Sequence, residues 1–237
     1  MSLIVLEGLD GSGKGTQTAL LFESLRKRTE VRKISFPDYE SPSSTLVKMY
    51  LNGEFSESPE GVNAYAASSF YAVDRYASFQ KKWRADYERG VLFLADRYTT
   101  SNIVYQLTKL PRSQWEEYIR WAEDFEYEKL RLPRPDLVLF LDMPPEVSQK
   151  LLSVRYHGDE AKKDLHERNP GYLAHCRDSA LFAASLLGWK VISCAQNGEP
   201  RSMEDIHREI ETLVTEAAVC WNSTPQPLTI NTGHSPS

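Results

Sequence analysis

The sequence predicts an α/β fold in which a five-stranded parallel sheet carries helices on both faces. Short apolar runs alternate along the chain with longer segments of helical spacing, and this alternation is typical of a parallel sheet. The first apolar run ends in a glycine-rich turn that leads directly into a helical segment. The 237 residues, 41 % apolar and 26 % charged, suffice for one hydrophobic core and exclude wholesale disorder.

The first expected strand consists of leucine and β-branched residues, ends at a glycine and reads as a buried strand. Five short segments in all are expected to be strands. They span residues 3–6, 31–35, 91–95, 137–141 and 190–193. The expected helices follow from apolar residues at helical spacing, from proline at a first turn and from glycine after a last one. They span residues 14–28, 43–51, 62–89, a segment starting soon after 96, 145–155, 171–188 and 202–218.

Two polar segments differ from the rest of the chain. Residues 156–169 are polar and charged and lie between a helix and a proline, so we expect a mobile lid there. Residues 221–237 are rich in serine, threonine and proline with almost no apolar anchor, and we expect a disordered tail. The domain organisation that follows is a single domain over residues 1–220.

Composition excludes several classes of protein. The net charge of −5 gives no basic excess of the kind that holds nucleic acid. No apolar run approaches the roughly 20 residues of a membrane helix, and the amino-terminal segment does not resemble a secretory signal. The three cysteines, Cys176, Cys194 and Cys220, are widely spaced, which disfavours a zinc site or a disulfide framework. We therefore expect a cytoplasmic protein without a nucleic-acid or membrane partner.

The glycine-rich segment after the first strand predicts a phosphate-binding loop. Its glycines allow successive backbone N–H groups to point at phosphate oxygens, the helix N-terminus adds a favourable dipole, and the lysine reaches the β- and γ-phosphates. A strand-to-helix turn without a ligand is the alternative, and the spacing disfavours it. The candidate ATP-binding residues are Gly8, Leu9, Asp10, Gly11, Ser12, Gly13, Lys14, Gly15 and Thr16.

The residue after the loop lysine departs from the common pattern. A serine or threonine is usual there, because its hydroxyl binds Mg²⁺, but this chain has Gly15. The string Gly13-Lys14-Gly15-Thr16 resembles the loop of adenylate kinases, which lack that hydroxyl. The departure weakens a direct Mg²⁺ contact here without affecting nucleotide binding.

Asp96 and Arg97 close the third expected strand. A carboxylate at the carboxyl end of a strand beside a phosphate loop is well placed to serve Mg²⁺, and a following arginine can hold a second phosphate in a bidentate manner. A surface ion pair is the alternative reading of these two residues alone. We take Asp96 and Asp10 as the candidate metal ligands.

Several motifs together resemble the thymidylate kinase family, within the nucleoside monophosphate kinases. The string from Asp96 to Gln106 resembles the family signature, and segments 36–39, 71–75 and 135–142 extend the resemblance over most of residues 3–215. The resemblance implies a three-layer P-loop kinase fold with a mobile lid. It also implies transfer of the ATP γ-phosphoryl group to thymidine monophosphate (dTMP), with Mg²⁺ as cofactor.

The resemblance assigns roles to the residues expected around dTMP. Tyr71, or in its place Phe70, would stack on thymine, and Arg75 would donate a hydrogen bond to a base carbonyl. Tyr71 and Arg75 are four residues apart on the expected helix, so both can face one pocket. Arg97 would bind the dTMP phosphate. The other implied contacts are Asp10, Phe36 and Tyr39 along the pocket, Asn102 towards the acceptor phosphate, Tyr105 near the sugar 2′ carbon, and Gln106.

The resemblance also implies a source for the last catalytic cation. Gly11 stands where one branch of the family has a catalytic arginine, and the other branch supplies basic groups from the lid. Arg155 and Arg168 are therefore candidate catalytic residues beside Lys14 and Arg97, although a solvated charge run is the plainer reading of the lid. Asp38 stands where the family often has arginine, which puts one contact to the acceptor phosphate in doubt.

No general base is needed for this reaction, because a phosphate oxygen of dTMP is largely ionised at neutral pH. The five histidines form no visible constellation. Two alternatives remain open: a catalytically silent nucleotide-binding member of the family, and a kinase with another pyrimidine acceptor. The resemblance, together with apolar residues such as Phe79 and Trp83 on the long helix, favours a homodimer.

Overall fold

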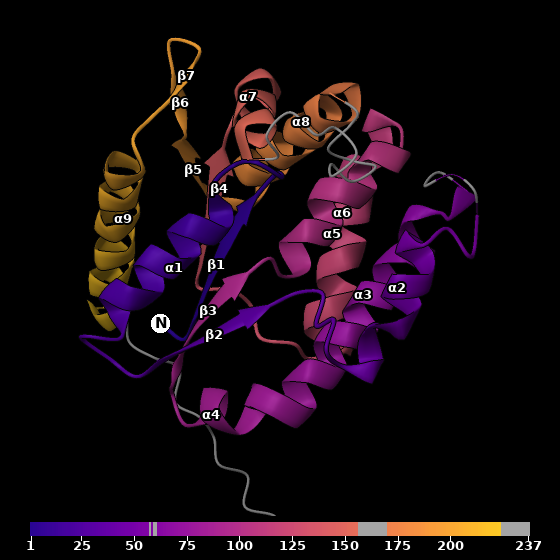
Figure 1. Cartoon of the computed structure of the whole chain (residues 1–237). Helices are drawn as coiled ribbons and strands as arrows, with labels where there is room; N and C mark the ends of the chain where they lie inside the picture. The colour runs from indigo at the N-terminus through magenta and orange to yellow at the C-terminus, as the bar shows by residue number, and fades with distance from the viewer. Residues whose placement is uncertain (57, 59–60, 156–169, 224–237) are drawn as a thin grey trace, which may run out of the picture.

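A five-stranded, fully parallel sheet forms the centre of the molecule (Figure 1). The computed structural model describes residues 1–56, 58, 61–155 and 170–223. The strands lie in the order β2-β3-β1-β4-β5. Their bounds are β1 (Leu3–Gly8), β2 (Val31–Ser35), β3 (Leu92–Asp96), β4 (Leu137–Asp142) and β5 (Lys190–Ser193). The expected number, type and approximate positions of the strands are confirmed.

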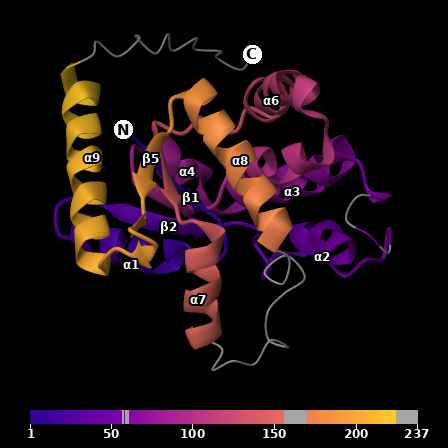
Figure 2. The same ribbon diagram turned by 90° about the horizontal axis from the view of Figure 1, so that it is seen from above.

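Helices cover both faces of the sheet. Helices α1 (Lys14–Leu25) and α9 (Met203–Ser223) pack on one face, and α3 (Ala64–Ser78), α5 (Thr99–Gln106) and α8 (Pro170–Leu187) lie over the other. Figure 2 shows α9 and α3 on opposite sides of the sheet. Successive side chains of β1 point to opposite faces of the sheet, so the core has two halves. Leu3 and Val5 face α5 and α8, whereas Ile4 and Leu6 face α1 and α9. The three-layer α/β class is confirmed.

The long helix expected over residues 62–89 is interrupted. Helix α3 is followed by a π-helical turn over Phe79–Trp83 and by α4 (Arg84–Glu88), and Gly90, with φ 88°, follows α4. The side chain of Asn63 caps α3 by accepting a hydrogen bond from the Ala66 N–H at 2.9 Å. Phe79 and Trp83 are buried within the core, and Trp83 packs on Phe93 with ring centroids 5.1 Å apart. These two side chains therefore cannot form a dimer surface, and the argument for a dimer that used them was wrong.

The segment between β3 and β4 contains structure that the sequence did not reveal. Helix α6 (Trp115–Glu123) follows two short 3₁₀ turns and runs into a second π-helical turn over Asp124–Lys129. A small hairpin, β6 (Ala195–Gln196) with β7 (Glu199–Pro200), was also not expected. Helices α2 (Thr45–Leu51) and α7 (Pro145–Arg155) lie where the sequence placed them. The expected lid and tail lie outside the described residues, except for the last turn of α9.

None of the helices in the described part of the chain combines the length and apolar character that crossing a membrane requires.

Candidate active site

The candidate site lies at the carboxyl edge of the sheet, where β1 and β3 end side by side. Leu6 pairs with Asp96 in the parallel register, and the Arg97 N–H donates to the Leu6 carbonyl at 3.2 Å. The glycine-rich loop follows β1 and α5 follows β3, on opposite faces of the sheet. Ligands of open parallel sheets bind in the crevice formed where the chain departs to both faces. The two motifs that the sequence singled out therefore meet at this edge.

The glycine-rich loop has a conformation that its residue types dictate. Gly11 and Gly13 have φ values of 78° and 82°, which side chains rarely adopt. A Cβ atom on Gly8 would lie 2.6 Å from the Ser12 Oγ and 3.2 Å from the Leu141 carbonyl oxygen. The loop then enters α1 directly, and the first N–H groups of a helix suit a phosphate because they have no partner within the helix. The buried Ser12 Oγ has no hydrogen-bond partner among the described residues.

Two ion pairs join the loop to the end of β3. The Lys14 Nζ lies 3.0 Å from the Asp96 Oδ1, and the Arg97 Nη2 lies 2.7 Å from the Asp10 Oδ1. The Arg97 Nη1 donates to the Tyr105 hydroxyl at 2.9 Å. Arg97 itself has φ 65°, a strained conformation for a residue with a side chain. Each of the two cations is therefore paired with a carboxylate, and Arg97 has a second, Glu7, at 3.6 Å.

The surroundings of Arg97 keep it charged. Burial disfavours the guanidinium ion, but Tyr105, Asp10 and Glu7 outweigh that effect and raise its pKa well above the ordinary value. Burial likewise raises the pKa of the Tyr105 phenol well above its usual range, so Tyr105 is a neutral hydroxyl. Arg97 thus presents a permanent positive charge to any phosphate at this edge.

A pocket of about 360 Å³ opens between these motifs and α3. Eleven of the residues that the sequence proposed for the site line it together. They are Asp10, Lys14, Phe36, Tyr39, Tyr71, Arg75, Asp96, Arg97, Asn102, Tyr105 and Gln106. The pocket therefore combines charged groups that suit phosphate with an aromatic wall that suits a base.

Other proposed residues lie elsewhere. Phe70 is not part of the pocket lining and packs on Phe55 with ring centroids 5.3 Å apart, so of the two alternatives Tyr71 is the one in the pocket. Asp38 also lies outside this lining, and its carboxylate pairs with Lys82 at 2.5 Å. The departure from the family pattern at Asp38 therefore does not alter the described pocket wall.

The two candidate cations of the lid cannot be placed in the site. Arg155 is the last residue of α7, and its side chain lies outside the described residues, as does all of Arg168.

Arg75 is fixed in the pocket wall by a carboxylate. It is 1 % exposed, and its Nε and Nη2 lie 2.6 Å and 2.5 Å from the Glu126 Oε2 and Oε1. Burial disfavours the charge, but Glu126 raises the pKa of Arg75 above its ordinary value. The Asn102 Nδ2 also donates to the Glu126 Oε1, at 3.0 Å. Asn102 was expected to reach the acceptor phosphate, whereas its amide nitrogen lies beside Arg75.

Two functional carboxylates escaped the sequence analysis. Glu126 lies in the π-helical turn after α6, and no local pattern marks it. Glu7 is fully buried in β1 and accepts hydrogen bonds from Thr100, Ser101 and the Gly8 N–H, which ties the loop to α5. A charged residue inside an otherwise apolar strand was a signal that could have identified Glu7.

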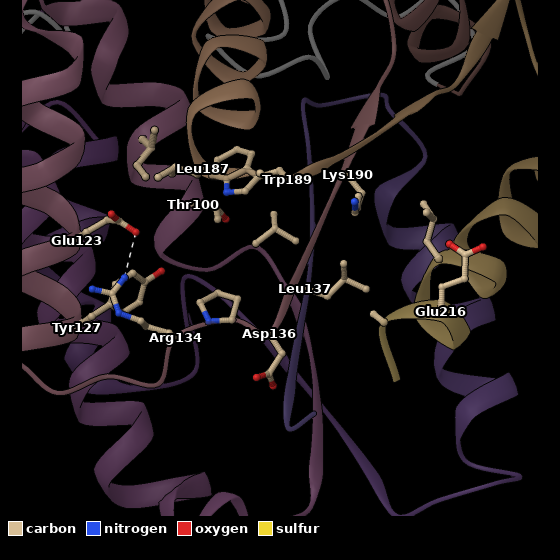
Figure 3. A pocket seen from close by; sticks show the side chains of 16 residues that line it. Thr100, Glu123, Tyr127, Arg134, Asp136, Leu137, Leu187, Trp189, Lys190 and Glu216 are labelled. Carbon is tan, nitrogen blue, oxygen red and sulfur yellow. Dashed lines mark hydrogen bonds and ion pairs between the residues drawn. The ribbon is translucent and has the colours of Figure 1, made fainter. Parts of the chain in front are cut away.

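A larger hollow of about 640 Å³ lies at the opposite edge of the sheet, where β4 and β5 begin (Figure 3). Its polar lining includes Arg134, which pairs with Glu123 at 3.1 Å, and it contains none of the residues proposed to bind nucleotide, acceptor or metal. The amino-terminal edge of a parallel sheet is also not where such folds bind nucleotides. The hollow at the carboxyl edge is therefore the candidate active site.

Comparisons with known proteins identify the family of this chain. The thymidylate kinase family model matches residues 6–210. A probable thymidylate kinase of Thermococcus gammatolerans is 30 % identical over 90 % of this chain and 95 % of its own. The thymidylate kinase of Caenorhabditis elegans is 35 % identical over 62 % of this chain and 65 % of its own. A solved thymidylate kinase structure from Candida albicans, 22 % identical, covers 92 % of both chains with a TM-score of 0.66 and thus shares the fold. The chain belongs to the thymidylate kinase family.

Proposed function

We propose that this protein transfers the γ-phosphoryl group of ATP to the 5′-phosphate of dTMP, giving dTDP and ADP. The observation that carries the proposal is one pocket that joins Lys14 and Arg97 to Tyr71 and Arg75. The first two residues provide charge for two phosphate-bearing ligands, and the last two provide a ring and a hydrogen-bond donor for a base. Membership of the family makes ATP the expected donor.

The chemistry requires charge neutralisation more than proton transfer. The attacking oxygen of a phosphate monoester is largely ionised above its second pKa of about 6, so no general base is needed. The described lining of the pocket contains no histidine. The obstacle is the repulsion between two anions, and Lys14 and Arg97 reduce it while they align the acceptor with the donor.

The carboxylates of the site fit a magnesium ion. Mg²⁺ is usually held by one or two carboxylates together with substrate phosphates, and Asp10 and Asp96 stand beside the two cations that would bind those phosphates. Among the described residues no cluster of three or more metal-ligating side chains occurs. When bound, Mg²⁺ would neutralise charge on the transferring phosphoryl group.

The acceptor would lie with its base against α3 and its phosphate at Arg97. Tyr71 stacks on the base, Arg75 binds a base carbonyl, and the Tyr105 ring occupies the space beside the sugar. The donor phosphates lie on the loop from Gly8 to Thr16. Phe36, Tyr39 and Gln106 complete the wall around the acceptor.

The activity is tested by an ADP-release assay with Mg-ATP and a panel of nucleoside monophosphates. We expect dTMP to react far faster than the adenine, guanine or cytosine monophosphates. Lys14→Met removes the phosphate-binding cation and should abolish turnover. Lys129→Met is the matched control, because Lys129 forms an exposed ion pair with Asp124 away from the pocket. Preference for a purine monophosphate, or for thymidine itself, would refute the assignment.

The lid is proposed to supply a further cation during transfer. Arg155 ends α7, and an arginine can bind two phosphate oxygens at once. Arg155→Met should lower kcat by about 10²- to 10⁴-fold, by analogy with arginine fingers, with nucleotide affinities nearly unchanged. Near-normal kcat in both Arg155→Met and Arg168→Met would show that the lid contributes no catalytic cation.

We also propose a cytoplasmic homodimer built from a single domain over residues 1–220. Helix α3 exposes Val73 and Tyr76, which are 47 % and 41 % accessible and suit a two-fold contact between helices. Sedimentation at micromolar concentration tests this, and a stable species of one chain mass, 27.1 kDa, would contradict it.

A further inference from the structure

Glu126 does not line the pocket, yet it contacts two residues that do. It is 1 % exposed and lies in the π-helical turn Asp124–Lys129. Its two oxygens accept from the Nε and Nη2 of Arg75, and Oε1 also accepts from the Nδ2 of Asn102. One buried carboxylate therefore links α3, which carries Arg75, to α5, which carries Asn102.

The pairing determines which edge of the Arg75 guanidinium is free. Glu126 uses the edge formed by Nε and Nη2, so the edge formed by Nη1 and the outer hydrogen of Nη2 remains. Nη1 makes one long contact, 3.4 Å to the carbonyl oxygen of Tyr98. A flexible side chain with several rotatable bonds is thus held with donors available to the pocket that it lines.

The same carboxylate determines the orientation of the Asn102 amide. Its nitrogen donates to the Glu126 Oε1 at 3.0 Å and to the Ser68 carbonyl oxygen at 3.2 Å, which uses both N–H bonds. Exchange of the oxygen and nitrogen positions would place an acceptor against these two acceptors. No hydrogen bond from the described residues reaches the Oδ1, and Asn102 lines the pocket, so its Oδ1 can serve as an acceptor for a ligand there.

We infer that Glu126 is a positioning residue that sets base selectivity, by holding Arg75 as a donor and Asn102 as an acceptor towards the pocket. This inference rests on the proposed function. A donor beside an acceptor complements the imide edge of thymine or uracil, where a carbonyl adjoins an N–H. Cytosine presents an amino group beside an unprotonated nitrogen, so both of its groups would oppose the fixed pair.

Glu126→Gln tests the inference because it keeps the size of the side chain but replaces one acceptor by a donor. Glutamine cannot accept from both Arg75 nitrogens and Asn102. The KM for dTMP should rise about 10- to 100-fold, the usual cost of a misplaced binding group. The kcat/KM preference for dTMP over dCMP should fall by at least about tenfold, while the KM for ATP should stay within about twofold.

A matched control separates positioning from folding. Asp86 is another poorly exposed carboxylate, paired with Arg89 at 2.5 Å near the end of α4 and far from the pocket lining. Asp86→Asn should lower stability without changing the selectivity between dTMP and dCMP. If Glu126→Gln does not fold, Glu126→Asp keeps the charge while moving the carboxylate, and the same selective loss is expected. If the KM for ATP rises as much as the KM for dTMP in the folded variant, the inference is overturned.

A binding cycle provides a readout that needs no turnover. Calorimetric dTMP affinities are compared for wild type, Arg75→Ala, Glu126→Gln and the double variant. If Glu126 acts through its partners, the double variant loses less affinity than the product of the two single losses. Multiplicative losses would overturn the inference. If the wild type binds dTMP and Glu126→Gln binds it with the same affinity, the inference alone is refuted. If the wild type does not bind dTMP, the proposed function is refuted as well.

Discussion

At the scale of single residues, the ion pair of Arg75 with Glu126 means that a substitution at Arg75 affects stability as well as ligand binding. Both side chains are 2 % accessible, so removal of the arginine strands a carboxylate in the interior. Arg75→Ala should therefore lower the free energy of unfolding by about 3–5 kcal/mol, in addition to weakening the binding of dTMP. Urea unfolding measures the loss, and Arg75→Ala/Glu126→Gln should recover part of it. An Arg75→Ala variant as stable as wild type would contradict the buried pair.

The sugar-side prediction concerns Tyr105. Its hydroxyl accepts from Arg97, and its ring lies 5.1 Å from the centre of that guanidinium. Tyr105→Phe keeps the ring, so it should keep the preference for deoxyribose while losing about 0.5–1.5 kcal/mol of dTMP binding. Tyr105→Ala should relax the preference, measured as the kcat/KM ratio of dTMP to its ribonucleotide. Unchanged discrimination in the alanine variant would refute a steric role for the ring.

At the scale of elements, the phosphate loop offers two glycines with opposite surroundings. A Cβ on Gly8 would clash with Ser12 and with the backbone of Leu141, whereas a Cβ on Gly15 would meet nothing within 4 Å. Gly8→Ala should cost about 1–3 kcal/mol of stability and weaken ATP binding, because the loop must shift. Gly15→Ala, the matched control, should leave both nearly unchanged. Thermal unfolding and ATP titration would distinguish the two, and a tolerated Gly8→Ala would contradict the loop geometry.

The elements that the sequence predicted well are those with a strong local pattern. The bounds expected for β4 and α7 agree with the structure to within one residue, because an apolar run and a proline pair mark them plainly. The π-helical turn at Phe79–Trp83 carries no such mark, since its residues also suit an uninterrupted helix. The same holds for the turn that carries Glu126, where tertiary contacts and not spacing fix the conformation.

Only part of the candidate site could be predicted from the sequence. Residues attached to strand ends, such as Lys14 and Arg97, could be placed because parallel strands bring their carboxyl ends to one edge. Glu126 and its contact with Asn102 could not, because they depend on how α6 packs against α3 and α5. Sequence motifs thus identified the charged groups that meet at this edge of the sheet, and only the structure identified what holds Arg75.

At the scale of the whole molecule, buried titratable groups predict how stability depends on pH. Burial raises the pKa of the Cys176 and Cys194 thiols from 9.0 to about 12. Several buried tyrosines, among them Tyr98 and Tyr105, have pKa values raised by burial as well. All of these groups are neutral in the folded protein and ionise more readily when it unfolds.

The protein should lose stability at alkaline pH. Above pH 9 the unfolded chain loses these protons first, so the free energy of unfolding should fall as the pH rises. Each buried thiol contributes about 1.4 kcal/mol per pH unit between its unfolded and folded pKa values. Urea unfolding between pH 8 and pH 11 measures the slope, and Cys176→Ala and Cys194→Ala should each reduce it. A stability that is flat over this range would contradict the burial of these groups.

The paired charges of Lys14 with Asp96 and of Arg97 with Asp10 have a consequence for how the ligands assemble. A phosphate that binds either cation must displace its carboxylate, and a displaced carboxylate attracts a divalent cation. Anion uptake and cation uptake are therefore thermodynamically linked, each raising the affinity for the other by the same factor. We therefore expect the site to bind a nucleotide together with its metal more tightly than free orthophosphate or free Mg²⁺.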